Sequence, residues 1–176
     1  MFDSLIEKRR SIRRYKDRAV EQDKVAALIE AALFAPSSMG RTPWEFIVVD
    51  DKGMLEKLST SKAHGASFLK NAPLGIVVCA DPAKSDVWVE DASIAAIFIQ
   101  LAAESIGLGS CWIQIRERMH ESGSKAGDYV KRLLDIPDNL EVECFVAAGY
   151  PDETKPGKKK EDLLYDRVHA GVYGKK

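Results

Sequence analysis

The sequence has almost no net charge, few cysteines and histidines, and no long hydrophobic run. Its 26 lysine and arginine residues are balanced by 27 acidic residues, which gives a formal net charge of −1. Proteins dedicated to nucleic acid usually carry a clear basic excess. The longest apolar-rich stretch, residues 92–103, contains Ser93 and Gln100 and is shorter than the roughly 20 residues that span a bilayer. These absences argue against a nucleic-acid partner and against a membrane partner.

Cysteine usage and the N-terminus point to a reducing compartment. Cys79, Cys111 and Cys144 are an odd number of cysteines and lack the spacing of metal ligands. Cys79 and Cys144 lie within apolar runs, which predicts buried thiols. Charged residues at Asp3 and Glu7 arrive before any apolar run forms, so we expect no secretory signal. Together these features predict a cytoplasmic protein without a metal site.

The length suits one domain with a substantial core, and we expect a single domain over residues 1–176. Apolar residues recurring every three to four positions predict helices, and short β-branched runs predict strands. Helices alternating with strands indicate a layered α/β or α+β fold. The expected helices cover the N-terminal residues up to the basic cluster, residues 21–34, a short stretch after Asp51, residues 91–106 and residues 124–134; the expected strands cover residues 46–50, 74–80, 110–115 and 142–149.

The helix expected over residues 91–106 carries apolar side chains on nearly every side. A helix of this kind has to be covered on all sides by other protein atoms. In a chain this small, a second subunit is a natural source of that cover. The pattern therefore predicts a homodimer.

A basic cluster, KRRSIRRYK at residues 8–16, places six positive charges within nine residues. Arginine offers a planar fork that grips phosphate at two points, and Ser11 adds a hydroxyl group. A phosphate monoester carries about −1.5 to −2 charges near neutral pH, so one interpretation is a site for a small phosphorylated molecule. The other interpretation is a solvated helix end whose charges only aid solubility.

Four segments in order along the chain carry a resemblance to a known family. They are RRSIRRY at 9–15, APSSMGRTPWEFIVV at 35–49, GLGSCWI at 107–113 and AAGYPDETKPGKKK at 147–160. With these segments the chain resembles the nitroreductase family of FMN-dependent oxidoreductases. The resemblance implies an α+β fold with a central, mostly antiparallel sheet flanked by helices. It also implies a homodimer with a buried central helix, and FMN as cofactor.

The resemblance assigns the basic cluster to the flavin. Arg9 and Ser11 would hold the ribityl phosphate and ribityl chain, with Arg10 beside them. Arg13 matches the basic position at the N1–O2 edge of the ring, where a cation stabilises the charge of the reduced flavin. Arg14 has no match and is expected to face solvent.

Three other segments also match positions near the flavin in the family. The first is a loop that reaches the flavin from the partner subunit, the second is a stretch whose backbone passes the reactive N5, and the third is a basic pair that completes the phosphate clamp. The matching residues are Pro36, Ser37, Ser38, Met39 and Arg41 in the loop; Trp112, Ile113 and Gln114 in the stretch; and Lys158 and Lys160 in the basic pair.

The loop departs from the family pattern. The common form is Asn-x-Gln-Pro-Trp, whereas this chain has GRTPW at residues 40–44. Gly40 removes an amide, and Arg41 adds a charge that would favour an acidic substrate. The C-terminal clamp also uses lysines, which neutralise phosphate with less geometric selection than arginine.

The resemblance implies a ping-pong oxidoreductase. NAD(P)H reduces the flavin, and an electron-poor small molecule (a nitroaromatic, quinone, flavin or enone) is then reduced at the same place. No side-chain nucleophile is required, which agrees with a chain holding only three histidines and no triad or metal quartet. Two alternatives stay open: a specialised or divergent flavin-family enzyme with altered chemistry, and a nucleic-acid-binding module that uses the basic N-terminal arm.

Overall fold

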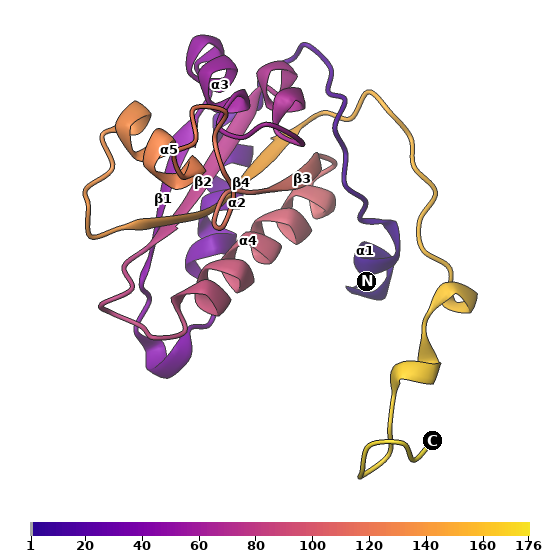
Figure 1. Ribbon diagram of the computed structural model, residues 1–176. Coiled ribbons are helices and arrows are strands. Elements are labelled where there is room, and N and C mark those ends of the chain that lie inside the picture. Colours follow the sequence, from indigo (N-terminus) through magenta and orange to yellow (C-terminus); the bar gives the residue numbers. More distant parts are fainter. Residues whose placement is uncertain (1) are drawn as a thin grey trace.

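The computed structural model describes residues 2–176, and its centre is one four-stranded antiparallel sheet (Figure 1). The strand order is β1-β2-β4-β3. The strands are β1 (Trp44–Val49), β2 (Leu74–Ala80), β3 (Gly109–Gln114) and β4 (Glu141–Gly149). Each strand pairs antiparallel with its neighbour. All four strands lie where the sequence predicted them, within one residue at each end except that β1 begins two residues earlier, at Trp44.

The helices also follow the prediction. They are α1 (Phe2–Lys8), α2 (Gln22–Leu33), α3 (Lys52–Ser59), α4 (Trp88–Ser105) and α5 (Ala126–Leu134). Asp51 caps α3 by accepting a hydrogen bond from the amide of Met54 at 2.7 Å. Four short 3-10 turns cover Ser38–Gly40, Ser67–Asn71, Lys160–Asp162 and Tyr165–Arg167.

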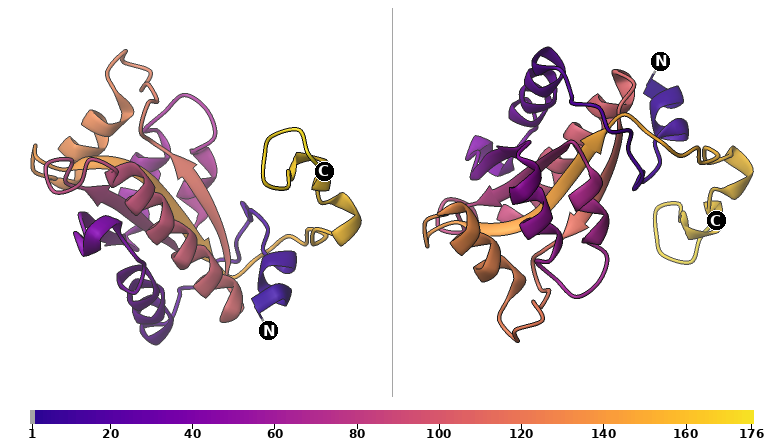
Figure 2. Two further views of the ribbon diagram at one scale, coloured as in Figure 1. Left: turned by 90° about the horizontal axis from the view of Figure 1, so that it is seen from below. Right: turned by 90° about the horizontal axis from the view of Figure 1, so that it is seen from above.

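Helices cover both faces of the sheet, which confirms the expected α+β arrangement (Figure 2). On one face, α2 and α4 pack with Ile76, Val78 and Val146. On the other, α3 and α5 pack with Val77 and Phe145. Every residue of β2 is buried, since this central strand is covered on both faces. That burial explains why the strand reads as a continuous apolar run and shows no alternation.

Helix α4 is covered on one side only within this chain. Ala92, Ala96 and Ile99 are fully buried against the sheet. On the outer side, Ile97 is 37% exposed, and Ile94 and Phe98 are half-buried. The expected cover on all sides of α4 is therefore not provided by one chain.

Among the described residues 2–176, no helix has the length and apolar character needed to cross a membrane.

The C-terminal tail stands apart from the sheet and its helices, whereas α1 contacts α4 (Figures 1 and 2). The C-terminal tail after residue 157 is exposed except at His169, which is half-buried. Several of its exposed side chains are large and apolar, among them Leu164, Tyr165, Val168 and Tyr173. Beyond Lys158, whose amide donates to the Glu7 carbonyl, these apolar side chains are not covered by the chain itself.

Candidate functional site

The basic segment Arg9–Arg13 lies beside the start of β3. Ser11 forms a parallel bridge with Ser110, and the amide of Ile12 donates to the Ser110 carbonyl at 2.9 Å. Gly109 permits this approach, because a Cβ atom there would lie 2.8 Å from side-chain carbons of Ile12. The contact fixes the segment at one edge of the sheet.

The C-terminal tail lies against the same segment. Lys155 donates from Nζ to the Ser11 carbonyl at 2.6 Å, and Arg10 donates to the Pro156 carbonyl. The amide of Lys158 donates to the Glu7 carbonyl at 2.9 Å. Two basic segments from opposite ends of the sequence therefore run side by side, and the backbone of Lys158 is placed next to the end of α1.

Glu153 fixes the turn between these two segments. Its carboxylate accepts from the amides of Arg13 at 2.5 Å and Arg14 at 3.2 Å, and it lies 3.4 Å from Lys155 Nζ. These bonds lower the pKa of Glu153, the Arg13 amide having the largest effect. The Glu153 carboxylate therefore orients the backbone of the basic segment. It binds the amide of Arg13 and leaves the guanidinium of Arg13 free of this contact.

Cys111 follows Ser110 in β3, next to the basic segment. Burial raises the pKa of its thiol, while the charges of Arg13, Lys155 and Arg9 act in the opposite direction. The backbone contacts of Ser11 and Ile12 with Ser110 thus place the predicted segment from Arg9 to Arg13 at the start of β3. They also bring in Lys155, which contacts the Ser11 carbonyl and which the sequence analysis did not single out.

Lys62 is a second cation that the sequence analysis missed. It is half-buried, and burial lowers the pKa of its amine, with the positive charge of Arg118 acting in the same direction. The Cys111 thiol acts in the opposite direction. Its segment, residues 60–72, had no periodic pattern, and nothing in the local sequence marks Lys62 as part of a site. In contrast, the basic composition of KPGKKK, residues 155–160, was a sequence feature that could have indicated Lys155.

The loop predicted to touch the flavin lies at the opposite end of α4. Ser38 donates its amide to Asp91 at 2.8 Å, near the N-terminus of the helix, whereas the basic segment lies by β3, which follows the helix C-terminus. Eighteen helical residues span about 27 Å. Within one chain, the structure does not bring Pro36, Ser37, Ser38, Met39 and Arg41 to the basic segment.

Arg41, whose added charge was expected to favour an acidic substrate, has an acidic partner within the chain. It forms an ion pair with Asp86 at 3.0 Å, and its second nitrogen contacts Met39. Met39 has a left-handed backbone, φ 53°, and its side chain is 84% exposed. The added charge in the GRTPW variant is therefore paired with an acid of the same chain.

The stretch Trp112–Gln114 forms the second half of β3. Ile113 is buried in the core, so only its backbone is available to a ligand. The indole of Trp112 donates to Gln114 at 3.0 Å, and Gln114 in turn donates to Glu143 at 3.1 Å. Glu143 is 3% exposed. These hydrogen bonds fix the strand edge that continues from Ser110.

Glu143 is a buried acid that the sequence analysis passed over. It lies at an irregularity where Val78 pairs with Cys144 and Cys79 with Val142, so Glu143 is the extra residue of a β-bulge. Its second oxygen has no hydrogen-bond partner, and the closest cation, Arg116, is 4.0 Å away. Burial raises the pKa of Glu143. The sequence feature that could have indicated a buried acid was the position of Glu143 inside the apolar run EVECFVAAG, residues 141–149.

Glu143→Gln is expected to stabilise the protein at about pH 8 and to have a smaller effect at about pH 5. Because the folded pKa is raised above the ordinary value of 4.5, the folded chain binds the proton more tightly than the unfolded chain. The stability from this group is present at low pH and is lost as pH rises through the raised pKa. Glutamine keeps an acceptor for Gln114 and cannot ionise. Urea midpoints at the two pH values measure the effect, with Glu56→Gln on exposed α3 as the control; an equal shift at both values would contradict the expectation.

Comparison with known proteins identifies the family. The model of the nitroreductase family matches residues 6–64 and 55–150. The chain belongs to this family. It is also similar to the solved structure of an FMN-dependent nitroreductase from Clostridium difficile, with 51% identity, a TM-score of 0.94, and coverage of 96% of this chain and 98% of that one. The nitroreductase fold expected from the sequence is confirmed by this likeness.

Two curated relatives extend the comparison. A protein of Archaeoglobus fulgidus, whose name pairs NADH dehydrogenase with NAD(P)H nitroreductase, is 41% identical over 94% of each chain. An NADH dehydrogenase of Thermus thermophilus is 39% identical, covering 92% of this chain and 91% of the relative. Nitroreductase-family chains of nearly the same length therefore match this one from end to end.

Proposed function

We propose that this protein passes two electrons from NAD(P)H to an electron-poor small molecule (a nitroaromatic, quinone, flavin or enone) in two half-reactions at one site. Membership of the nitroreductase family makes the chain an FMN-dependent NAD(P)H oxidoreductase. The observation that carries the proposal is the contact of the basic segment with the C-terminal tail at the start of β3, where Lys155 donates to the Ser11 carbonyl and Arg10 donates to the Pro156 carbonyl.

The residues present fit the phosphate and ribityl parts of FMN. A phosphate monoester is nearly dianionic at neutral pH and needs cations with hydroxyl or amide donors. Arg9 and Ser11 are half-buried in the basic segment. The tail that carries Lys158 and Lys160 is held to α1 by the hydrogen bond from the Lys158 amide to the Glu7 carbonyl. When bound, FMN supplies the two-electron chemistry by accepting a hydride at N5 and passing two electrons on.

The chain itself supplies binding and electrostatics. Arg9, Lys158 and Lys160 would neutralise the phosphate, and Lys155 holds the backbone of Ser11 in place. Arg13, whose guanidinium lies 5.8 Å from the centre of the Phe68 ring, would place a positive charge at the N1–O2 edge. The β3 edge at Trp112, Ile113 and Gln114 would pass the ring near N5.

A homodimer, each copy folded as one FMN-binding domain over residues 1–176, completes the proposed site. The loop 36–41 contacts the N-terminal end of α4 and the basic segment lies at β3, which follows the other end of this helix of about 27 Å, so we propose that a second copy brings its loop to the flavin. Phe34 is 82% exposed, Met39 is 84% exposed and Ile97 on α4 is 37% exposed. Between Phe34 and Met39, Ala35 packs with Ala95 of α4, next to Ile94 and Phe98. Their burial in a dimer would also supply the cover that α4 lacks.

The purified protein is expected to be yellow, to hold FMN, and to lose its colour when NADH or NADPH is added without oxygen. Arg13→Ala is expected to keep FMN and to bleach more slowly, because a cation at the ring edge stabilises the reduced form more than the oxidised form. Absorbance spectra and stopped-flow bleaching measure both. Protein that is colourless and takes up no added FMN would overturn the proposal, and equal losses of binding and bleaching in Arg13→Ala would move that residue to the phosphate clamp.

A further inference from the structure

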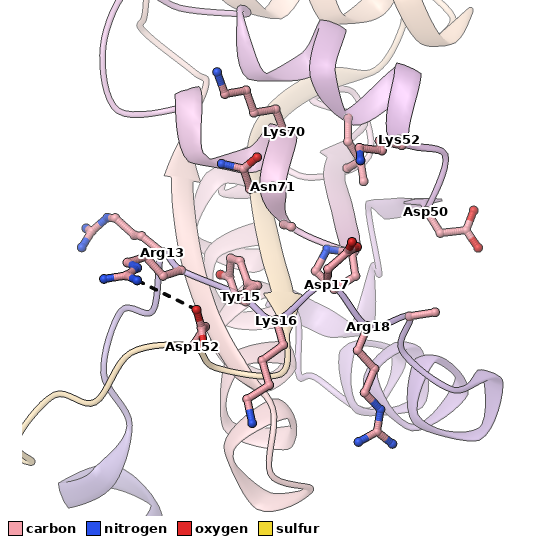
Figure 3. A pocket seen from close by; sticks show the side chains of 15 residues that line it. Arg13, Tyr15, Lys16, Asp17, Arg18, Asp50, Lys52, Lys70, Asn71 and Asp152 are labelled. Carbon is pink, nitrogen blue, oxygen red and sulfur yellow. Dashed lines mark ion pairs between the residues drawn. The ribbon is translucent and has the colours of Figure 1, made fainter.

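The basic cluster divides in the fold, and only its first part faces the predicted flavin site. Beyond Arg13 the chain crosses the end of the sheet, where Tyr15 forms a bridge with Pro151 and the Lys16 amide donates to Tyr150 at 2.9 Å. On this side there is a separate hollow of about 500 Å³ (Figure 3). Residues 13–19 form one wall of the hollow.

Cations from three separate parts of the chain surround this hollow. Lys52 comes from the first turn of α3, and Lys70 comes from the 3-10 turn before β2. Figure 3 shows both opposite the basic segment. In total the hollow is lined by six cations, Arg13, Arg14, Lys16, Arg18, Lys52 and Lys70, and by three acids, Asp17, Asp50 and Asp152.

The positive charge of the hollow is not compensated by its own acids. Arg14 is paired with Asp152 at 3.9 Å, and Arg18 is paired with Glu21 outside the hollow. The remaining four cations form no ion pair within 4 Å among the described residues. Like charges gathered from distant segments repel one another, and a concave surface of one sign concentrates anions. Charge and shape both indicate an anionic ligand.

The hollow also offers an apolar floor and a size suited to a nucleotide. Leu55, Ala72, Pro73 and Tyr15 line it between the charges. Sites for small molecules are typically clefts of roughly 300–1,000 Å³ with apolar walls and a few placed polar groups. Its volume and mixed lining therefore suit a ligand that joins a flat ring to phosphate groups.

Arg13 connects the hollow to the proposed flavin site. It lines the hollow, and its charge also acts on Cys111 among the clamp residues. A donor that placed its nicotinamide on the flavin near Arg13 could extend the rest of the molecule past this residue into the hollow. We propose that the hollow binds the adenosine diphosphate half of the nicotinamide donor, with Lys16, Lys52 and Lys70 facing its diphosphate. This proposal rests on the proposed function.

The test compares a whole donor with one that lacks the adenosine diphosphate half. Lys16→Glu/Lys52→Glu is expected to raise KM for NADH about tenfold, equivalent to about 1.4 kcal/mol of binding free energy, with kcat little changed. KM for N-benzyl-dihydronicotinamide, which carries no phosphate, is expected to stay the same. The matched control is Lys57→Glu, which reverses a charge on the same helix at a residue that does not line the hollow.

Each outcome of this comparison is informative. A rise in KM for NADH alone supports the adenosine diphosphate site, and competitive inhibition by ADP in the wild type but not in the double variant supports it further. The proposal is overturned if KM for the two donors changes equally in the double variant, or if Lys57→Glu raises KM for NADH as much as the double variant does. If neither donor bleaches the wild-type flavin, the proposed function itself fails, whereas bleaching by both with no difference between variants removes only the present proposal.

Discussion

Gly149→Ala is expected to destabilise the protein by about 2–3 kcal/mol, because the site has no space for one methyl group. A Cβ atom at Gly149 would lie 2.5 Å from Cγ and 2.6 Å from Cδ of Pro73, and 3.1 Å from the Tyr15 ring. Pro73 cannot move freely, since its ring is covalently part of the backbone that enters β2. Relief of the contact with Pro73 therefore requires movement of β4, against which the Tyr15 ring packs.

Movement of Tyr15 would reach the functional site. Its hydroxyl is buried and donates to the Ile12 carbonyl at 2.6 Å, which ties the ring to the basic segment. We therefore expect Gly149→Ala to weaken FMN retention as well as stability. Both are measured on one sample, by urea unfolding and by the flavin content after gel filtration.

Gly127→Ala is the matched control. Gly127 lies in helix α5, and a Cβ atom there would meet nothing within 4 Å. The same substitution is expected to stabilise by about 0.5–1 kcal/mol, because alanine loses less backbone entropy than glycine when a helix forms. If the two variants unfold at the same urea concentration, the close packing around Gly149 does not destabilise Gly149→Ala, which contradicts the prediction.

Ile97→Glu is expected to convert the proposed dimer to a monomer. Ile97 lies on the outer side of α4, beside Ile94 and Phe98, where a second copy would cover it. Placing an unpaired carboxylate in an apolar interface costs about 3–5 kcal/mol, which lowers the association constant by a factor of roughly 100 or more. The variant should also lose FMN, because a monomer cannot receive loop 36–41 from a second copy.

Sedimentation or sizing at micromolar concentration, together with flavin absorbance, measures this result. The control is Val48→Glu, which places the same charge on an apolar side chain of β1 that is 42% exposed. It should remain dimeric and yellow. A wild-type monomer, or an Ile97→Glu dimer that keeps FMN, would contradict the proposed interface.

Elements with a strong local pattern were predictable. β2 and β4 appeared as apolar runs, and α2 and α4 appeared through their apolar spacing, since these patterns follow from burial of the element against the sheet. The ends of these elements were predicted less accurately than their centres. For example, α4 begins at Trp88, three residues before the predicted start. The residues there, Trp88 and Val89, are half-buried and do not by themselves distinguish a helix from a loop.

The candidate site was only partly predictable. Arg9, Ser11 and Arg13 follow one another in the sequence, and the family resemblance marks them as a unit. Lys155 and Lys62 lie in irregular segments, where only the basic composition around Lys155 was a sequence signal, and Glu143 was marked only as an acid within an apolar run. The contact of Lys155 with Ser11 and the burial of Glu143 in a bulge both depend on the fold. Such residues become visible once the backbone is folded.

The order and type of the elements and the presence of a concentrated cationic segment could be predicted from the sequence, because both depend on residues that are neighbours along the chain. The folded chain was needed to show that Lys155 contacts this segment, that residues 13–19 line a separate hollow, and that loop 36–41 lies at the other end of α4 from the segment. The physical reason is that electrostatic and packing energies depend on distance through space. Lys155 and Ser11 are separated by 144 residues in sequence and by 2.6 Å in the fold.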